Sequence, residues 1–101
     1  MLIYKICRRD EWEAAVVAGV YRGSQADRDD GFIHFSNAAQ VGATLRKHFA
    51  GQRDLLLVAV DAEALGPSLR FEVSRAGERF PHFYGELAVS LASEVKEINQ
   101  F

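Results

Sequence analysis

The chain has 101 residues, of which 49% are hydrophobic and 26% are charged, and its formal net charge is −2. This length favours one domain over residues 1–101, and this composition is typical of a soluble globular protein. The small net charge excludes a global attraction to DNA or to an anionic membrane, so we expect neither as a partner.

The cysteine content and the apolar runs indicate a cytoplasmic protein. Cys7 is the only cysteine and cannot form an internal disulfide, which fits a reducing compartment. No signal peptide is evident, because the first apolar run is short and is broken by Arg8, Arg9 and Asp10. The longest apolar run, residues 55–60, is far too short to cross a bilayer.

The first elements predicted along the chain are a strand and a helix. Residues 2–7 form an apolar run typical of a strand. Asp10 has the residue type of an N-cap, and Glu13 three residues later completes a capping-box pattern. A helix is therefore predicted over residues 11–18, with Gly19 as its C-terminal stop.

A polar segment, a short strand and a second helix follow. Residues 20–30 are rich in charge and predict an exposed loop, and residues 31–35 predict a short apolar strand. Ser36 or Asn37 can cap the next helix, which is expected to end at Gly51. The apolar face of this helix is formed by Val41, Leu45 and Phe49.

The second half of the chain predicts strands. Residues 55–60 are uniformly apolar, which is typical of a central strand covered on both faces. Residues 61–66 predict a short turn or helix and residues 76–79 a turn, whereas residues 68–74 and 87–95 alternate as strands. Leu69, Phe71 and Val73 are expected to face inward, with Arg70 and Glu72 on the other face. The order of elements predicts an α+β fold, with helices packed on a mixed or mainly antiparallel sheet.

Two short segments present histidines in apolar surroundings. They are Gly31-Phe32-Ile33-His34-Phe35-Ser36 and Phe80-Pro81-His82-Phe83-Tyr84-Gly85. Histidine is the side chain that most readily gains and loses a proton near neutral pH. If the fold brings the two segments together, they form a polar site in an apolar setting.

The first segment can hold a ribose or a phosphate. His34 and Phe32 share one face of a strand, and Ser36 joins them if the strand extends that far. A histidine and a hydroxyl two residues apart make a compact hydrogen-bonding pair suited to either group. The alternative is a core histidine bonded to a carbonyl group, with Ser36 only capping the next helix.

The second segment predicts a turn, a bulge or a sheet edge, because Pro81 cannot donate a backbone hydrogen bond. Histidines and aromatic residues in a loop often serve function, and Tyr84 adds a phenol. The alternative is an aromatic plug that closes the end of a sheet.

Other site residues depend on what the fold brings together. Glu72 becomes relevant only near His34 or His82, and Tyr21 can line the rim of a pocket or simply pack. A metal site is not supported, because the histidines lack the short spacings of zinc motifs and no cysteine cluster exists. A serine, histidine and acid arrangement of Ser36, His82 and Glu72 lacks a nucleophile elbow.

The pattern resembles domain-of-unknown-function family 952, a family of small bacterial proteins, over nearly the whole chain. The resemblance rests on Trp12 with Gly19-Val20-Tyr21, on the two histidine segments, on Gln40 and on Phe71-Glu72. Phe71 stands where that family often has tryptophan, and Glu86 stands where proline is common.

This resemblance implies a fold similar to that of the ADP-ribosyltransferases, which the RNA 2′-phosphotransferases share. That fold is a split, mainly antiparallel sheet with two or three helices around a cleft that holds NAD. By the resemblance, His34 and Ser36 would hold the nicotinamide-side ribose, and His82 or Tyr84 would orient the nicotinamide or a phosphate. Many such transferases also use a late glutamate.

Three hypotheses for function follow. The first is a nucleotide-sized cleft that binds NAD or an ADP-ribose-like ligand and transfers an ADP-ribosyl group. Its catalytic residues would be His34 and His82, and its ligand-binding residues Ser36, Tyr84, Tyr21 and Glu72. The second is a non-enzymatic site for a small ligand, which is favoured because Glu94 and Glu97 lie late but carry no motif. The third is a structural or interaction module. We expect a monomer or a weak dimer, with the strand at residues 87–95 as an edge for pairing.

Overall fold

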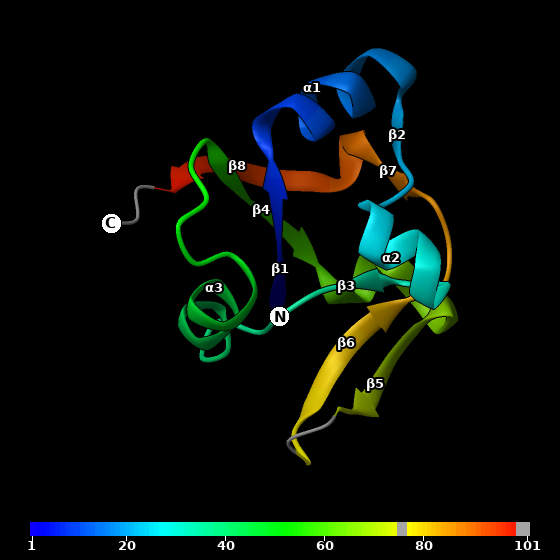
Figure 1. The fold of residues 1–101 in the computed structure, drawn as a ribbon. Helices are drawn as coiled ribbons and strands as arrows, with labels where there is room; N and C mark the ends of the chain where they lie inside the picture. Colours follow the sequence, from blue (N-terminus) through cyan, green and yellow to red (C-terminus); the bar gives the residue numbers. More distant parts are fainter. Residues whose placement is uncertain (75–76, 99–101) are drawn as a thin grey trace.

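In the computed structural model, which describes residues 1–74 and 77–98, the strands form three antiparallel sheets (Figure 1). The strands are β1 (Leu2–Arg8), β2 (Val20–Tyr21), β3 (Ile33–His34), β4 (Leu55–Asp61), β5 (Leu69–Val73), β6 (Arg79–Phe83), β7 (Leu87–Ala88) and β8 (Ala92–Ile98). The helices are α1 (Arg9–Ala18), α2 (Gln25–Asp30) and α3 (Val41–His48), with 3₁₀ helices η1 (Ala62–Ser68) and η2 (Val89–Leu91). The sheet orders are β1–β4–β8, β3–β6–β5 and β2–β7. The predicted α+β class with mainly antiparallel pairing is confirmed.

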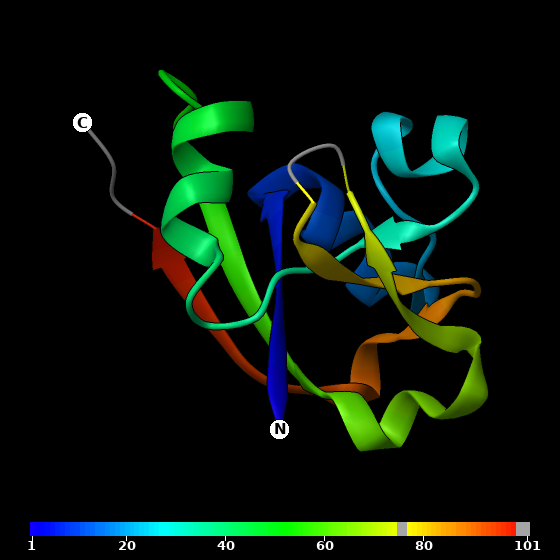
Figure 2. The same cartoon turned by 90° about the horizontal axis from the view of Figure 1, so that it is seen from below.

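The uniformly apolar strand β4 lies at the centre of its sheet, as its sequence predicts. It pairs with β1 on one side and with β8 on the other. Val58 and Val60 are fully buried and pack in one core cluster with Ile3 of β1. On the other face of this sheet α3 lies beside β1 and β4, as Figure 2 shows. Burial on both faces explains why this strand carries no polar alternation.

The helix α1 begins two residues before its predicted start. Its N-cap is Arg8, whose N–H donates to Glu11 Oε1 at 3.3 Å, so the predicted cap of Asp10 with Glu13 is wrong. The shift arises because β1 runs directly into the helix with no turn between them. Gly19 ends the helix with φ of 88°, as predicted, because this left-handed conformation suits glycine.

The prediction of an exposed loop at residues 20–30 is wrong. This segment forms β2 and α2, and Tyr21 and Asp27 are buried. Ser24 caps α2: its Oγ accepts from the Asp27 N–H at 3.2 Å, and Asp27 Oδ2 accepts from the Ser24 N–H at 2.9 Å. The charges of the segment misled the prediction because one of them, Asp27, is buried and makes specific bonds inside the protein instead of being solvated.

The helix α3 is shorter than predicted. Its N-cap is Gln40, whose N–H donates to Asn37 Oδ1 at 2.9 Å, so Asn37 caps the preceding turn and not the helix itself. The helix ends at His48 with Phe49 as its C-cap, ahead of the predicted stop at Gly51. No helix of the described part of the chain is long and apolar enough to span a membrane.

Pro81 lies inside a sheet, so the prediction of a turn, bulge or edge there is wrong. It belongs to β6, which is the middle strand of the β3–β6–β5 sheet. Its carbonyl oxygen accepts from the Phe35 N–H at 3.0 Å, just beyond the end of β3. A proline is tolerated in this middle strand because β3 pairs only with His82 and Phe83. The Pro81 nitrogen lies beyond these pairs, so no backbone N–H is needed there.

The strand β5 alternates as predicted, but its apolar face is covered only in part. Phe71 is 43% exposed and Val73 is 58% exposed, so the expectation that both face inward is wrong. The β5–β6 hairpin extends beyond the rest of the molecule, and its outer end therefore lacks a covering layer (Figure 1). The predicted turn at residues 76–79 includes Ala76, which lies outside the described residues.

The predicted single strand at residues 87–95 is wrong, because the chain changes sheets there. Leu87 and Ala88 pair with β2, η2 follows, and Ala92–Ile98 pairs with β4. Leu87 is fully buried, whereas Leu91 and Val95 are more than a third exposed. The strand β8 is an edge of its sheet, as expected of this part of the chain.

Candidate functional site

The two histidine segments meet in the β3–β6–β5 sheet. His34 of β3 is the direct partner of His82 of β6 in the antiparallel register. Their ring centroids are 5.7 Å apart at an interplanar angle of 71°. Directly opposed residues of an antiparallel pair project from the same face, so both imidazoles stand on one surface of the sheet.

Aromatic rings pack around the two imidazoles. The Phe32 ring stacks on His82 with centroids 4.0 Å apart and planes 21° apart. The same ring lies 4.6 Å from the His34 ring and 5.2 Å from the Tyr84 ring. We define the histidine cluster as Phe32, His34, Glu72, His82 and Tyr84. The aromatic contacts limit the rotation of both imidazoles.

Glu72 joins the cluster from the neighbouring strand β5. Its Oε1 lies 2.8 Å from His82 Nδ1 and accepts from the Tyr84 hydroxyl at 2.6 Å. A carboxylate at Nδ1 favours the form of His82 that carries its proton there. His82 Nε2 has no hydrogen-bond partner in the described part of the chain. His82 is therefore an oriented imidazole with one ring nitrogen unoccupied.

The Glu72 carboxylate and the Tyr84 phenol shift each other's titration. The bond from Tyr84, and then the bond from His82, lower the pKa of Glu72 below its ordinary value. The bond to Glu72 raises the pKa of Tyr84. Near neutral pH the pair therefore consists of a carboxylate and a neutral phenol that donates to it.

His34 is anchored by Asp27 of α2. His34 Nδ1 lies 2.6 Å from Asp27 Oδ1, and Lys5 Nζ lies 2.8 Å from Asp27 Oδ2. Burial alone would raise the pKa of Asp27, but the bonds from His34 and Lys5 outweigh it and hold that pKa well below its ordinary value. Asp30 Oδ2 lies 3.0 Å from His34 Nε2. Each ring nitrogen of His34 thus faces a carboxylate.

Arg70 stands at the rim of the histidine cluster. Its guanidinium lies 5.1 Å from the centroid of the Tyr84 ring. It is exposed and forms no ion pair with any residue in 1–74 or 77–98. An exposed cation on the strand next to His82 can bind an anionic group such as a phosphate.

Two predicted site residues lie apart from the cluster in their contacts. The Ser36 hydroxyl is 3.0 Å from the Thr44 hydroxyl, and its backbone bridges to Tyr4 of β1. Tyr21 is buried against Trp12, with ring centroids 5.9 Å apart, and its hydroxyl has no partner among the described residues. The fold brings His34, His82, Glu72 and Tyr84 together, whereas Ser36 and Tyr21 make their contacts with other residues.

The late glutamates also lie elsewhere. Glu97 bonds Arg9 at 2.6 Å, and Glu94 lies 3.6 Å from Lys96. Glu94 lines a cavity of about 270 Å³ between α3 and the β1–β4–β8 sheet, together with Tyr4. No residue of the histidine cluster lines that cavity, so the histidine cluster and the cavity lie at different places in the fold.

Sequence reasoning missed Asp27, Asp30 and Arg70. The spacing of Ser24 and Asp27 is that of a capping box, and Gly31 follows as a helix stop, so a short helix at residues 25–30 could have been predicted. No local pattern shows that the Asp27 carboxylate is buried. Within the described residues no group of three or more histidine, cysteine, aspartate or glutamate side chains is arranged to hold a metal ion.

Comparisons with known proteins define the family. Residues 6–95 match the family described as Protein of unknown function (DUF952), and the chain belongs to that family. The chain is similar to the X-ray structure of protein CC0527 from Caulobacter crescentus, with 47% identity and a TM-score of 0.95 over 98% of this chain and 87% of that chain. The solution NMR structure of CC0527 gives 48% identity and a TM-score of 0.88 over 97% and 84% of the two chains. Among curated proteins no match was found.

Proposed function

We propose that the histidine cluster binds a phosphorylated nucleoside of the NAD or ADP-ribose kind. One observation carries this proposal. His34 and His82 stand side by side across β3 and β6, and the Nδ1 atom of each ring is held by a carboxylate. On this surface His34 can bond a ribose hydroxyl, while His82 Nε2 stays available to position a phosphate or to accept a proton.

The neighbouring groups fit the rest of such a ligand. Arg70 forms no ion pair within the described residues and can bind a phosphate, which guanidinium groups bind in a bidentate manner. Tyr84 is 37% exposed, so part of its aromatic side chain is open to contact with a ligand. His34 takes the ribose without Ser36 in this arrangement, because the Ser36 hydroxyl already bonds Thr44.

The same geometry supports transfer of the ADP-ribosyl group. The bond between ribose C1′ and the nicotinamide nitrogen breaks, and a bond forms between C1′ and an acceptor hydroxyl oxygen. His82 Nε2 takes the proton of that hydroxyl, while Glu72 at Nδ1 stabilises the imidazolium that results. The positive charge that develops on the ribose lies near the carboxylates of the site, which stabilise it.

A titration followed by NMR tests the binding. The ¹⁵N-labelled protein is titrated with NAD, ADP-ribose and nicotinamide, and the ring resonances of His34 and His82 are followed. We expect ADP-ribose to shift the resonances of both rings. Arg70→Met should weaken the binding of ADP-ribose but not the binding of nicotinamide. His48→Ala is the matched control, because His48 lies on α3 outside the cluster. The proposal is wrong if no ligand shifts either ring at millimolar concentration.

A second candidate function is binding without catalysis. It is favoured by one observation, that both ring nitrogens of His34 face carboxylates while Glu94 and Glu97 lie away from the cluster. In that case the site would report a small ligand to a partner. Binding of NAD with no release of nicotinamide would support this candidate, and nicotinamide release that His82→Ala abolishes would support the transferase.

A further inference from the structure

The Asp27 side chain is the most heavily bonded carboxylate near the histidine cluster. It is 2% exposed. Oδ1 accepts from the His34 N–H at 3.2 Å and lies 2.6 Å from His34 Nδ1. Oδ2 accepts from the Ser24 N–H at 2.9 Å, and Lys5 Nζ reaches both oxygens, at 2.8 and 3.1 Å. Bonds from three elements therefore hold this carboxylate in one orientation.

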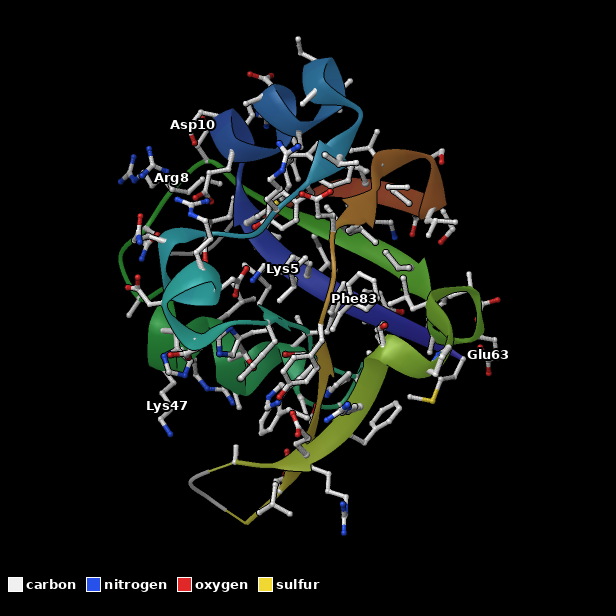
Figure 3. All side chains as sticks on the ribbon, turned by 90° about the vertical axis from the view of Figure 1, so that its right-hand side faces the viewer. Lys5, Arg8, Asp10, Lys47, Glu63 and Phe83 are labelled. Atoms are coloured by element: carbon white, nitrogen blue, oxygen red, sulfur yellow. The ribbon has the colours of Figure 1, made fainter. Side chains whose placement is uncertain are left out.

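Lys5 holds the charge of Asp27 inside the protein. Its side chain is 6% exposed and points from β1 toward α2 (Figure 3). Burial raises the pKa of a carboxylate, and a cation beside it opposes that rise and so favours the ionised form. The ammonium of Lys5 keeps both oxygens of Asp27 as acceptors.

The two carboxylates at His34 differ in how firmly they are held. Asp30 is 56% exposed, and its contact with His34 Nε2 is its only ion pair in the described part of the chain. Asp27 is buried and contacts Nδ1 at the shorter distance, 2.6 Å against 3.0 Å. A ligand hydroxyl can replace Asp30 at Nε2 but cannot reach Nδ1.

We propose that Asp27 is the positioning residue of His34. It fixes the neutral imidazole with its proton on Nδ1 and thereby presents Nε2 to a ligand. The consequence for ligand binding rests on the proposed function, whereas the effect on the imidazole does not. Asp27 touches no reacting atom and acts only through His34.

Long-range ¹H–¹⁵N spectra of the unliganded wild type directly test whether Asp27 fixes the proton of His34 on Nδ1. At a pH where His34 is neutral, we expect the shifts of its ring nitrogens to show a protonated Nδ1 and an unprotonated Nε2. The opposite assignment, with the proton on Nε2, overturns the proposal without any variant. A merely structural role for Asp27 would leave His34 in the Nε2–H form that histidine favours in water.

Two variants separate the effects of Asp27 and Asp30 on the position of the His34 proton. Asp27→Leu alone leaves Lys5 buried without a partner and can unfold the protein, so the charge-balanced double variant Lys5→Met/Asp27→Leu is used beside it. In the folded double variant His34 keeps only Asp30, and we expect its proton to move to Nε2. Asp30→Asn is the matched control and should keep the proton on Nδ1. A folded double variant that retains the Nδ1–H form overturns the proposal.

Binding of ADP-ribose completes the test. We expect the double variant to bind ADP-ribose at least about tenfold more weakly, because its Nε2 then carries a proton and cannot accept a hydrogen bond from a ligand hydroxyl. If the wild type does not bind ADP-ribose, the proposed function fails while the nitrogen shifts still decide the role of Asp27. If the proton moves to Nε2 and affinity is unchanged, Asp27 does not position His34 for this ligand.

Discussion

The buried pair of Lys5 and Asp27 predicts an asymmetric mutant cycle. Asp27 without Lys5 still has the Ser24 N–H, the His34 N–H and the His34 ring as partners. The Lys5 ammonium without Asp27 has no other hydrogen-bond partner in residues 1–74 and 77–98. The cost of removing one partner should therefore depend strongly on which one is removed.

We expect Asp27→Leu to lower the free energy of unfolding by about 3–5 kcal/mol, because it leaves a buried ammonium unpaired. Lys5→Met should cost about 1–3 kcal/mol, because the three remaining donors stabilise the carboxylate. The double variant should cost less than Asp27→Leu alone, since it leaves neither charge buried. The double variant should therefore lose less free energy of unfolding than the sum of the losses in the two single variants.

Urea unfolding followed by circular dichroism measures these free energies, with constant slopes as the check on two-state behaviour. Equal costs for the two single variants, with simple addition in the double variant, would refute the reasoning.

The pH dependence of the free energy of unfolding gives a second check. Because the folded-state pKa of Asp27 is lowered, its contribution is complete above an ordinary aspartate pKa of about 3.9 and is lost as the pH falls below it. The double variant should lack this loss in acid.

Three further predictions concern other groups. Glu72→Gln should lower the pKa of Tyr84 toward its ordinary value, because the carboxylate that raises it is gone; a titration of the tyrosine ring by NMR that shows no change would contradict this. Burial raises the pKa of the Cys7 thiol to about 12, so the stability it contributes is complete below an ordinary thiol pKa of about 8.5 and is lost as the pH rises toward 12. Cys7→Ala should show a flatter decline of unfolding free energy in alkali than the wild type, and parallel declines would argue against a buried thiol. Tyr21→Phe should leave the free energy of unfolding unchanged or raise it by about 1–3 kcal/mol, since the buried hydroxyl has no partner among the described residues. A loss above about 1 kcal/mol in urea unfolding would show that this hydroxyl is bonded.

The histidine cluster was predictable in part because some of its determinants are local. Alternation along a strand places Phe32 with His34 and places Arg70 with Glu72, and these faces are set by the two-residue period of the backbone. The apolar run at residues 55–60 marks the central strand for the same kind of reason, since a strand buried on both faces needs no polar side. The family resemblance, which the match over residues 6–95 confirms, added the expectation that the two histidine segments belong together.

Tertiary structure alone decided which partners these side chains have. The register of β3 against β6 sets His34 opposite His82, and the register of β5 brings Glu72 to His82. The chain also bends at Ser36 toward β1, so local alternation did not predict its contact with Thr44.

Asp27 shows most clearly why the partners of these side chains could not be predicted from the sequence. Its sequence neighbours are charged and predict an exposed loop, yet Lys5, 22 residues away in the chain, makes its burial stable. Whether a charge is solvated or buried depends on a partner that only the fold supplies, whereas the faces of a strand depend on the backbone alone. The sequence by itself therefore determined the strand that carries His34, whereas the tertiary structure decided that His82 lies in a middle strand and which carboxylates orient the two histidines.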